Sequence, residues 1–114
     1  MLTVKILKWF PDTRASDHIT GNPGNLHSLT PYGFDGVMVG SGNTLPLTHI
    51  GENTLGTGSS SIHLKDVLLV PDIKKDLLSV SKLTTDYPLI FEFDGHHFVI
   101  KDKTTNKTIA KGSK

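Results

Sequence analysis

The chain contains no cysteine in its 114 residues. This absence excludes disulfides and cysteine-ligated metal sites, and it fits a reducing compartment. Long hydrophobic segments are also missing, since no apolar run approaches the ~20 residues that a membrane span needs. The N-terminus lacks the apolar stretch and small-residue cleavage site of a signal peptide. We therefore expect an intracellular, cytoplasmic protein with no membrane partner.

Neither sign of charge is in excess, because 12 Lys and Arg residues face 11 Asp and Glu residues. Proteins that bind nucleic acids use clustered positive charge to neutralise phosphates. Several lysines do lie near the C-terminus, but Thr, Asn and Asp residues separate them. We interpret them as a solvated sheet edge and expect no nucleic-acid partner.

Turn-forming residues are frequent and separate short apolar segments. The chain has 11 Gly and 6 Pro, a pattern typical of a β-rich fold. A chain of this length suffices for one domain and is too short for two ordinary ones. We therefore expect a single all-β domain over residues 1–114.

Alternation of apolar and polar residues predicts most of the strands. An Asp-Gly pair between apolar segments is a strong hairpin signal, and an unbroken apolar run indicates a strand buried on both faces. The expected strands are 2–10, a hairpin at 37–47, 49–55, 59–64, the apolar run 67–70, a hairpin at 89–102 around Asp94-Gly95, and 108–110.

The other segments are expected to form loops and one short helix. Residues 12–20 and 21–36 have little periodicity and are predicted as loops, the second with a possible helical turn. The one helix is predicted at 76–84, with Asp76 as its N-cap.

The most informative segment is 9–16, with the sequence WFPDTRAS. Asp12 follows an apolar segment, Thr13 comes next, and Ala-Ser follows after one further residue. This order resembles the Asp-Thr-Gly-Ala-Ser loop of aspartic proteases, with Arg14 at the position of the glycine.

Three further segments occur in the order expected for one branch of these enzymes. They are 37–42, 49–51 and, most distinctive, 64–83 with the sequence LKDVLLVPDIKKDLLSVSKL. With 9–20, they make the chain similar to the protease domain of Ty1/copia-type retrotransposon polyproteins, a retropepsin-like family. The resemblance covers roughly residues 9–112.

The resemblance implies a retropepsin-like closed β-barrel, the single lobe of an acid protease, with one short helix in the C-terminal third. It also implies a homodimer that acts on a polypeptide substrate. Asp12 matches the catalytic aspartate, and Thr13 matches the threonine that braces the opposite loop. The residues that match the substrate-binding flap are Val39, Gly40, Ser41, Gly42 and Asn43.

The chemistry of this family requires two carboxylates that share one proton. The charged carboxylate activates water, and the protonated one polarises the scissile carbonyl. A chain with one Asp-Thr motif can supply the pair only through a symmetric dimer. No cofactor and no metal are expected.

Arg14 conflicts with this scheme. Glycine at this position permits close approach of the partner loop, which a long side chain would obstruct. Two guanidinium groups near the dyad would also hold Asp12 ionised where a shared proton is needed. We therefore expect impaired catalysis. The alternative is a non-enzymatic domain that keeps the fold and dimer and binds a peptide or protein.

Six histidines invite a metal hypothesis, but their spacings match no ligand signature. The adjacent His96 and His97 follow a hairpin turn, where neighbouring strand residues point to opposite faces. We expect a surface or interface role for them and no metal site.

Overall fold

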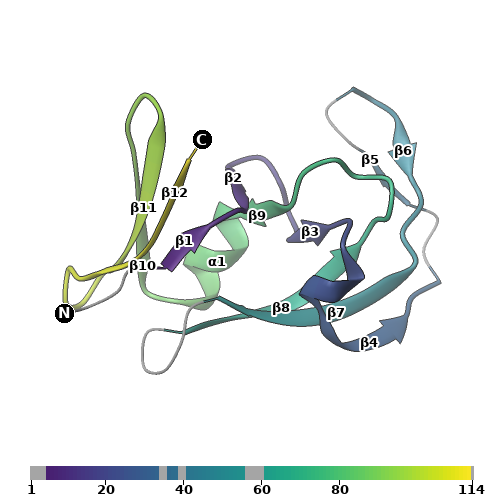
Figure 1. Ribbon diagram of the computed structural model, residues 1–114, viewed down its shortest axis with the longest axis horizontal. Helices are drawn as coiled ribbons and strands as arrows, with labels where there is room; N and C mark the ends of the chain where they lie inside the picture. The colour runs from purple at the N-terminus through teal and green to yellow at the C-terminus, as the bar shows by residue number, and fades with distance from the viewer. Residues whose placement is uncertain (1–4, 34–35, 39–40, 56–60, 114) are drawn as a thin grey trace.

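The structure is a computed structural model that describes residues 5–33, 36–38, 41–55 and 61–113 (Figure 1). These residues form short strands, one α-helix and one turn of 3-10 helix. In chain order they are β1 (Lys5–Leu7), β2 (Phe10–Asp12), β3 (Ile19–Thr20), η1 (Pro23–Asn25), β4 (His27–Pro31), β5 (Val37–Met38), β6 (Thr44–Leu45), β7 (His49–Leu55), β8 (Ile62–Leu69), β9 (Leu77–Ser79), α1 (Val80–Asp86), β10 (Leu89–Phe93), β11 (His97–Asp102) and β12 (Thr108–Ser113).

The strands lie in three sheets. The largest has the order β2-β9-β3-β8-β7-β4, the second has the order β1-β12-β11-β10, and β5 pairs with β6 in a separate hairpin. Figure 1 shows the second sheet at one end of the molecule and the β5–β6 hairpin at the other. The predicted all-β domain with one short helix is confirmed, and the described strands form open sheets without a closed barrel.

Two apolar clusters hold the sheets together. The smaller cluster is built on Ile19, Leu47 and Val70, with half-buried neighbours from β5, β6 and β9. It therefore supports the base of the β5–β6 hairpin. The larger cluster packs the second sheet and α1 against the first, and its buried members are Leu7, Trp9, Leu55, Ile62, Leu64, Val67, Leu78, Leu83, Leu89, Phe98, Ile100 and Ala110.

The helix prediction was wrong at its beginning. Residues 77–79 form strand β9, and α1 begins only at Val80, with the Ser79 side chain accepting a hydrogen bond from the Lys82 backbone N at 3.1 Å. β9 is paired on both sides, parallel to β2 and antiparallel to β3. Burial of Leu78 in this sheet outweighs its good helix propensity. Asp76 is therefore not the N-cap.

Two strand predictions also need correction. The segment predicted as one strand at 2–10 contains β1 and only the first residue of β2, which belong to different sheets, and its first residues lie outside the described part of the chain. β2 continues to Asp12 and β3 begins at Ile19, so the loop predicted at 12–20 is confined to residues 13–18. The predicted loop at 21–36 contains strand β4, which pairs with β7 through a register shift between His27 and Thr30. The short, irregular pairing explains why no alternation marks β4 in the sequence.

The strand at 49–55 and the hairpins at 37–47 and 89–102 are confirmed over the described residues. The strands predicted separately at 59–64 and 67–70 form one strand, β8, and residues 59 and 60 lie outside the described part of the chain. The last strand continues beyond the predicted 108–110 to Ser113. The Asp94-Gly95 hairpin joins β10 to β11, and the Asp94 carboxylate accepts hydrogen bonds from the backbone N of His96 and of His97. The apolar run at 67–70 lies in and just after β8, an inner strand, where Val67 and Val70 are fully buried.

Leu78→Ala tests the importance of β9. It should lower the free energy of unfolding by about 2–5 kcal/mol, because it leaves a cavity in the larger cluster. Leu29→Ala is the matched control, since Leu29 is 42% exposed and should change stability by about 0.5 kcal/mol or less. Urea denaturation measures both, and equal losses would contradict the placement of Leu78 in the core.

Candidate active site

Asp12 lies at the end of an edge strand, which pairs with only one neighbour among the described strands. β2 ends at Asp12, which lies opposite Ser79 in the parallel β2–β9 pair. The chain then loops past β9 and returns as β3, which pairs with the other side of the same strand. We call residues 13–18 the Asp12 loop. Both of its ends are therefore fixed by one strand, β9 (Figure 1).

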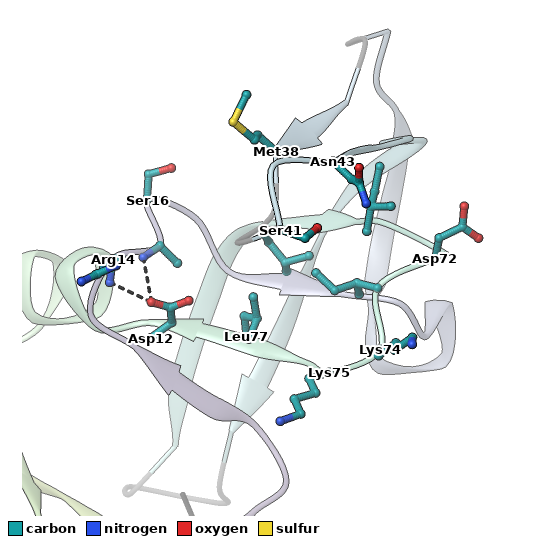
Figure 2. A pocket seen from close by; sticks show the side chains of 14 residues that line it. Asp12, Arg14, Ser16, Met38, Ser41, Asn43, Asp72, Lys74, Lys75 and Leu77 are labelled. Atoms are coloured by element: carbon teal, nitrogen blue, oxygen red, sulfur yellow. Dashed lines mark hydrogen bonds between the residues drawn. The ribbon is translucent and has the colours of Figure 1, made fainter.

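The Asp12 carboxylate is oriented by its own loop. Its Oδ1 accepts hydrogen bonds from the backbone N of Arg14 at 2.8 Å and of Ala15 at 3.2 Å, as the dashed lines in Figure 2 show. Within the described residues, Oδ2 accepts no hydrogen bond. One oxygen thus fixes the orientation of the group, and the other is left for a water molecule or a second carboxylate.

Thr13 and Arg14 are both exposed in the single chain. The Thr13 hydroxyl makes no hydrogen bond to the described part of the chain, and the Arg14 guanidinium makes no ion pair there. Arg14 is also absent from the residues with positive φ, so its backbone does not need glycine. Within one chain, Arg14 therefore does not obstruct Asp12. The predicted conflict between Arg14 and catalysis would arise only where a second copy approaches the Asp12 loop.

A groove of about 810 Å³ runs beside Asp12. It lies between the Asp12 loop, the β5–β6 hairpin and the segment that leads into β9 (Figure 2). Of the predicted flap residues, Ser41 and Asn43 line this groove together with Asp12. Val39 and Gly40 lie outside the described residues.

Two glycines shape the hairpin. Gly42, at the turn, has a φ of +88°, a conformation that other residues seldom adopt. Gly36 precedes β5, and a Cβ there would lie 2.6 Å from the backbone oxygen of Leu45. The hairpin is therefore closely packed at its base, and glycine suits the backbone conformation at position 42.

The groove combines apolar and charged surfaces. Its apolar lining comes from Ile19, Leu45, Ile73 and Leu77, which also belong to the smaller cluster, and from Met38, which is 74% exposed. Its charged lining residues are Asp12, Arg14, Asp72, Lys74 and Lys75. Such a surface suits an extended peptide, with apolar contacts for side chains and polar groups for the backbone.

Ser79 secures the Asp12 loop from behind, a role that the sequence did not reveal. It is fully buried, and its Oγ donates to the backbone oxygen of Ala15 at 2.7 Å. Its backbone N donates to Nδ1 of His18 at 2.9 Å. The residue that caps α1 therefore also holds the loop at two points.

His18 is the second residue that sequence reasoning missed. Its side chain is 1% exposed, and burial, assisted by the positive charge of Lys82, lowers its pKa from 6.5 to about 4, against the opposing charges of Asp86 and Asp17. The imidazole is therefore neutral near pH 7, as an Nδ1 acceptor must be. No spacing rule marks a histidine as an acceptor for a strand that lies 61 residues further along the chain.

A separate polar cluster anchors the end of the loop. Asp76 accepts hydrogen bonds from Oγ1 of Thr20 at 2.6 Å and from Nδ2 of Asn25 at 3.1 Å. Thr20 is fully buried, so this pairing satisfies a polar group that would otherwise be costly to bury. The segment leading into β9 is thereby tied to the segment that follows β3.

The remaining histidines do not gather at this site. His96 and His97 are exposed beside the β10–β11 turn. In the part of the chain that the structure describes, no group of three His, Asp or Glu side chains could hold a metal ion. Over the same residues, no helix is long and apolar enough to cross a membrane.

Comparisons with known proteins identify the family of this chain. Residues 9–87 match the family described as "Pol polyprotein, beta-barrel domain". The chain is 40% identical over 105 residues to the "Retrovirus-related Pol polyprotein from transposon RE2" of Arabidopsis thaliana, and 38% identical over 105 residues to the corresponding polyprotein from transposon RE1. No solved structure gives a significant match.

These matches define the class of domain. The chain belongs to the Pol polyprotein beta-barrel domain family, and its relatives are retrotransposon polyproteins. The matched region makes up 91% of this chain and 7% of each of the two relatives. The chain therefore corresponds to one small region of a much longer type of protein.

Ser79→Ala tests the role of this residue. It removes the cap of α1 and the hydrogen bond to Ala15, and it should lower the free energy of unfolding by about 1–3 kcal/mol. Ser81→Ala, on the exposed face of the same helix, should change it by about 0.5 kcal/mol or less. Thermal or urea denaturation compares the two variants, and equal stability of Ser79→Ala and the parent would refute the assignment.

Proposed function

We propose that this domain is an aspartic protease module of a retrotransposon Pol polyprotein, in which Asp12 from each of two copies forms the catalytic pair. The observation that carries the proposal is the position of Asp12. Its carboxylate is held by two backbone N–H groups and lies in the same groove as the β5–β6 hairpin. The substrate class is polypeptide. A cytoplasmic location is part of the proposal, because the chain has no cysteine to form disulfides.

The reaction divides two roles between the paired carboxylates. The ionised Asp12 accepts a proton from a water molecule, which attacks the scissile carbonyl carbon. The protonated Asp12 of the other copy donates a hydrogen bond to the carbonyl oxygen and stabilises the developing charge. Within the described residues, Oδ2 and the Thr13 hydroxyl make no hydrogen bond, which supports such a pairing because both remain available to a second copy.

Arg14 lowers the activity in this proposal. Its guanidinium is exposed and makes no ion pair within the described chain, so a dimer would bring it near the partner's Asp12. An ion pair there would favour the ionised form of both carboxylates, whereas the dyad needs one shared proton.

A second candidate function is peptide binding without cleavage. The observation that favours it is that a single chain already contains the groove, with its apolar lining and the hairpin beside it. The catalytic pair, in contrast, needs a second copy. A peptide could therefore bind even where Arg14 prevents the chemistry.

Arg14→Gly should increase cleavage. We expect this variant to cut a diverse peptide library at about pH 5 at least tenfold faster than the parent, because it frees the dyad to share a proton. Mass spectrometry of the products measures the rate. Asp12→Asn in the same background should abolish cleavage, since the amide cannot act as the base.

The outcomes separate the two candidate functions. Cleavage by the parent that Asp12→Asn abolishes would show that Arg14 is tolerated and would overturn the proposed impairment. Absence of cleavage by all forms, with retained peptide binding in a fluorescence anisotropy assay, would replace the protease proposal with the binding function.

A dimer is the second requirement of the proposal. Light scattering at micromolar concentration should give a mass of two chains, with tighter association for Arg14→Gly because glycine permits closer approach of the two Asp12 loops. A monomer mass for both proteins would contradict the proposal.

A further inference from the structure

We propose that His18 is a positioning residue for Asp12, which holds the Asp12 loop in place by accepting a hydrogen bond from Ser79. The inference deepens the proposed protease function and rests on it only for the effect on cleavage. The placement of the loop can be tested without any activity.

A continuous series of hydrogen bonds connects His18 to the carboxylate. The Ser79 N–H donates to His18 Nδ1 at 2.9 Å, and the Ser79 Oγ–H donates to the Ala15 oxygen at 2.7 Å. The Ala15 N–H then donates to Asp12 Oδ1 at 3.2 Å. A shift of the Ser79 backbone would therefore move the peptide units on both sides of Ala15. The Ala15 N–H, which orients the Asp12 carboxylate, would move with them.

The backbone that follows the His18 side chain is also fixed. The His18 oxygen accepts from the Leu68 backbone N at 2.9 Å, and the Thr20 oxygen accepts from the Val70 backbone N at 2.9 Å. The ring is 1% exposed and lies at the point where the loop enters β3. The loop is thus attached to β8 by its backbone and to β9 by the His18 side chain.

This connection requires a neutral imidazole with its proton on Nε2. A protonated ring would present an N–H at Nδ1 to the Ser79 N–H, so that two donors would face each other. The charged groups around the ring come from its own loop and from α1: Asp17 on the loop, and Lys82 and Asp86 on the helix. Backbone oxygens of Lys65 and Asp66 in β8 hold the Lys82 ammonium at 2.9 and 3.3 Å.

Burial and Lys82 lower the pKa of His18 to about 4. Between about pH 4 and 6.5, the His18 side chain therefore binds fewer protons in the folded chain than in the unfolded chain. The stabilisation from neutral His18 is fully present above about 6.5 and is lost as the pH falls toward 4. The link to Ser79 thus persists at mildly acidic pH, where a carboxylate dyad operates.

The first test uses the unmodified chain. Nitrogen-15 NMR of the histidine rings should show His18 as the neutral Nε2–H form from pH 7 down to about 5, with a titration midpoint near 4. A proton on Nδ1, or a titration midpoint of His18 at the ordinary histidine pKa of 6.5, would overturn the proposal.

The second test compares two substitutions. The Oδ1 atom of Asn occupies nearly the place of Nδ1, so His18→Asn keeps an acceptor for Ser79, whereas the longer His18→Gln places its amide beyond it. Hydrogen exchange of the Ser79 amide, corrected for global opening with the amide of the buried Ile100, is the readout. We expect exchange within about threefold of the parent for His18→Asn and at least about tenfold faster for His18→Gln.

If the His18 side chain only fills space, the exchange rates of the Ser79 amide in the two variants should have the opposite order. Asn is smaller than Gln and leaves the larger cavity, so His18→Asn should then be the more disturbed variant. Equal exchange in the two variants, or faster exchange in His18→Asn, would refute the positioning role.

Cleavage by Arg14→Gly separates this inference from the proposed function. In that background, His18→Gln should lower kcat at least about tenfold with KM little changed, and His18→Asn should retain kcat within about threefold. If Arg14→Gly itself cuts nothing, the protease function fails, while the NMR and exchange results still decide whether His18 positions the loop.

Discussion

The structure depends on one constraint, the insertion of β9 between β2 and β3. The two strands that flank the Asp12 loop pair with opposite sides of β9, so the loop must cross it, and its two ends are fixed by one strand. Ser79 lies where β9 passes into α1, and its backbone N and side chain bind the loop from behind. This arrangement gives the half-buried Asp12 carboxylate a defined orientation, although a loop of this kind has little packing of its own.

The groove follows from the same arrangement. β9 and β3 contribute Leu77 and Ile19 to the smaller apolar cluster, and the β5–β6 hairpin packs on this cluster through Leu45. The strand that positions Asp12 therefore also helps to position the hairpin beside it (Figure 2). Arg14 does not disturb this single-chain structure, since its side chain is exposed. In the proposed dimer, the effect of Arg14 would arise where two guanidinium groups and two carboxylates meet.

The sequence predicted the features that depend on local patterns. Turn chemistry identified the Asp94-Gly95 hairpin, and an unbroken apolar run identified the inner strand at 67–70. The family resemblance identified Asp12 as the candidate catalytic residue and Ser41 and Asn43 as part of a flap, and the structure brings these three residues into one groove. Features that depend on tertiary pairing were not predictable. Leu77 and Leu78 have good helix propensity, and only the partners on both sides of β9 make them a strand. Likewise, no local pattern identifies His18 as the acceptor for the backbone N of Ser79, which lies 61 residues further along the chain.

The central claim is that two copies share one catalytic site. Calorimetric titration of the Arg14→Gly variant with a statine-type transition-state analogue tests it most directly, because the stoichiometry counts the chains in each site. The account predicts one inhibitor bound for every two chains, with binding lost in Asp12→Asn. One inhibitor for each single chain, unaffected by Asp12→Asn, would contradict it and would indicate a peptide-binding groove complete within one copy.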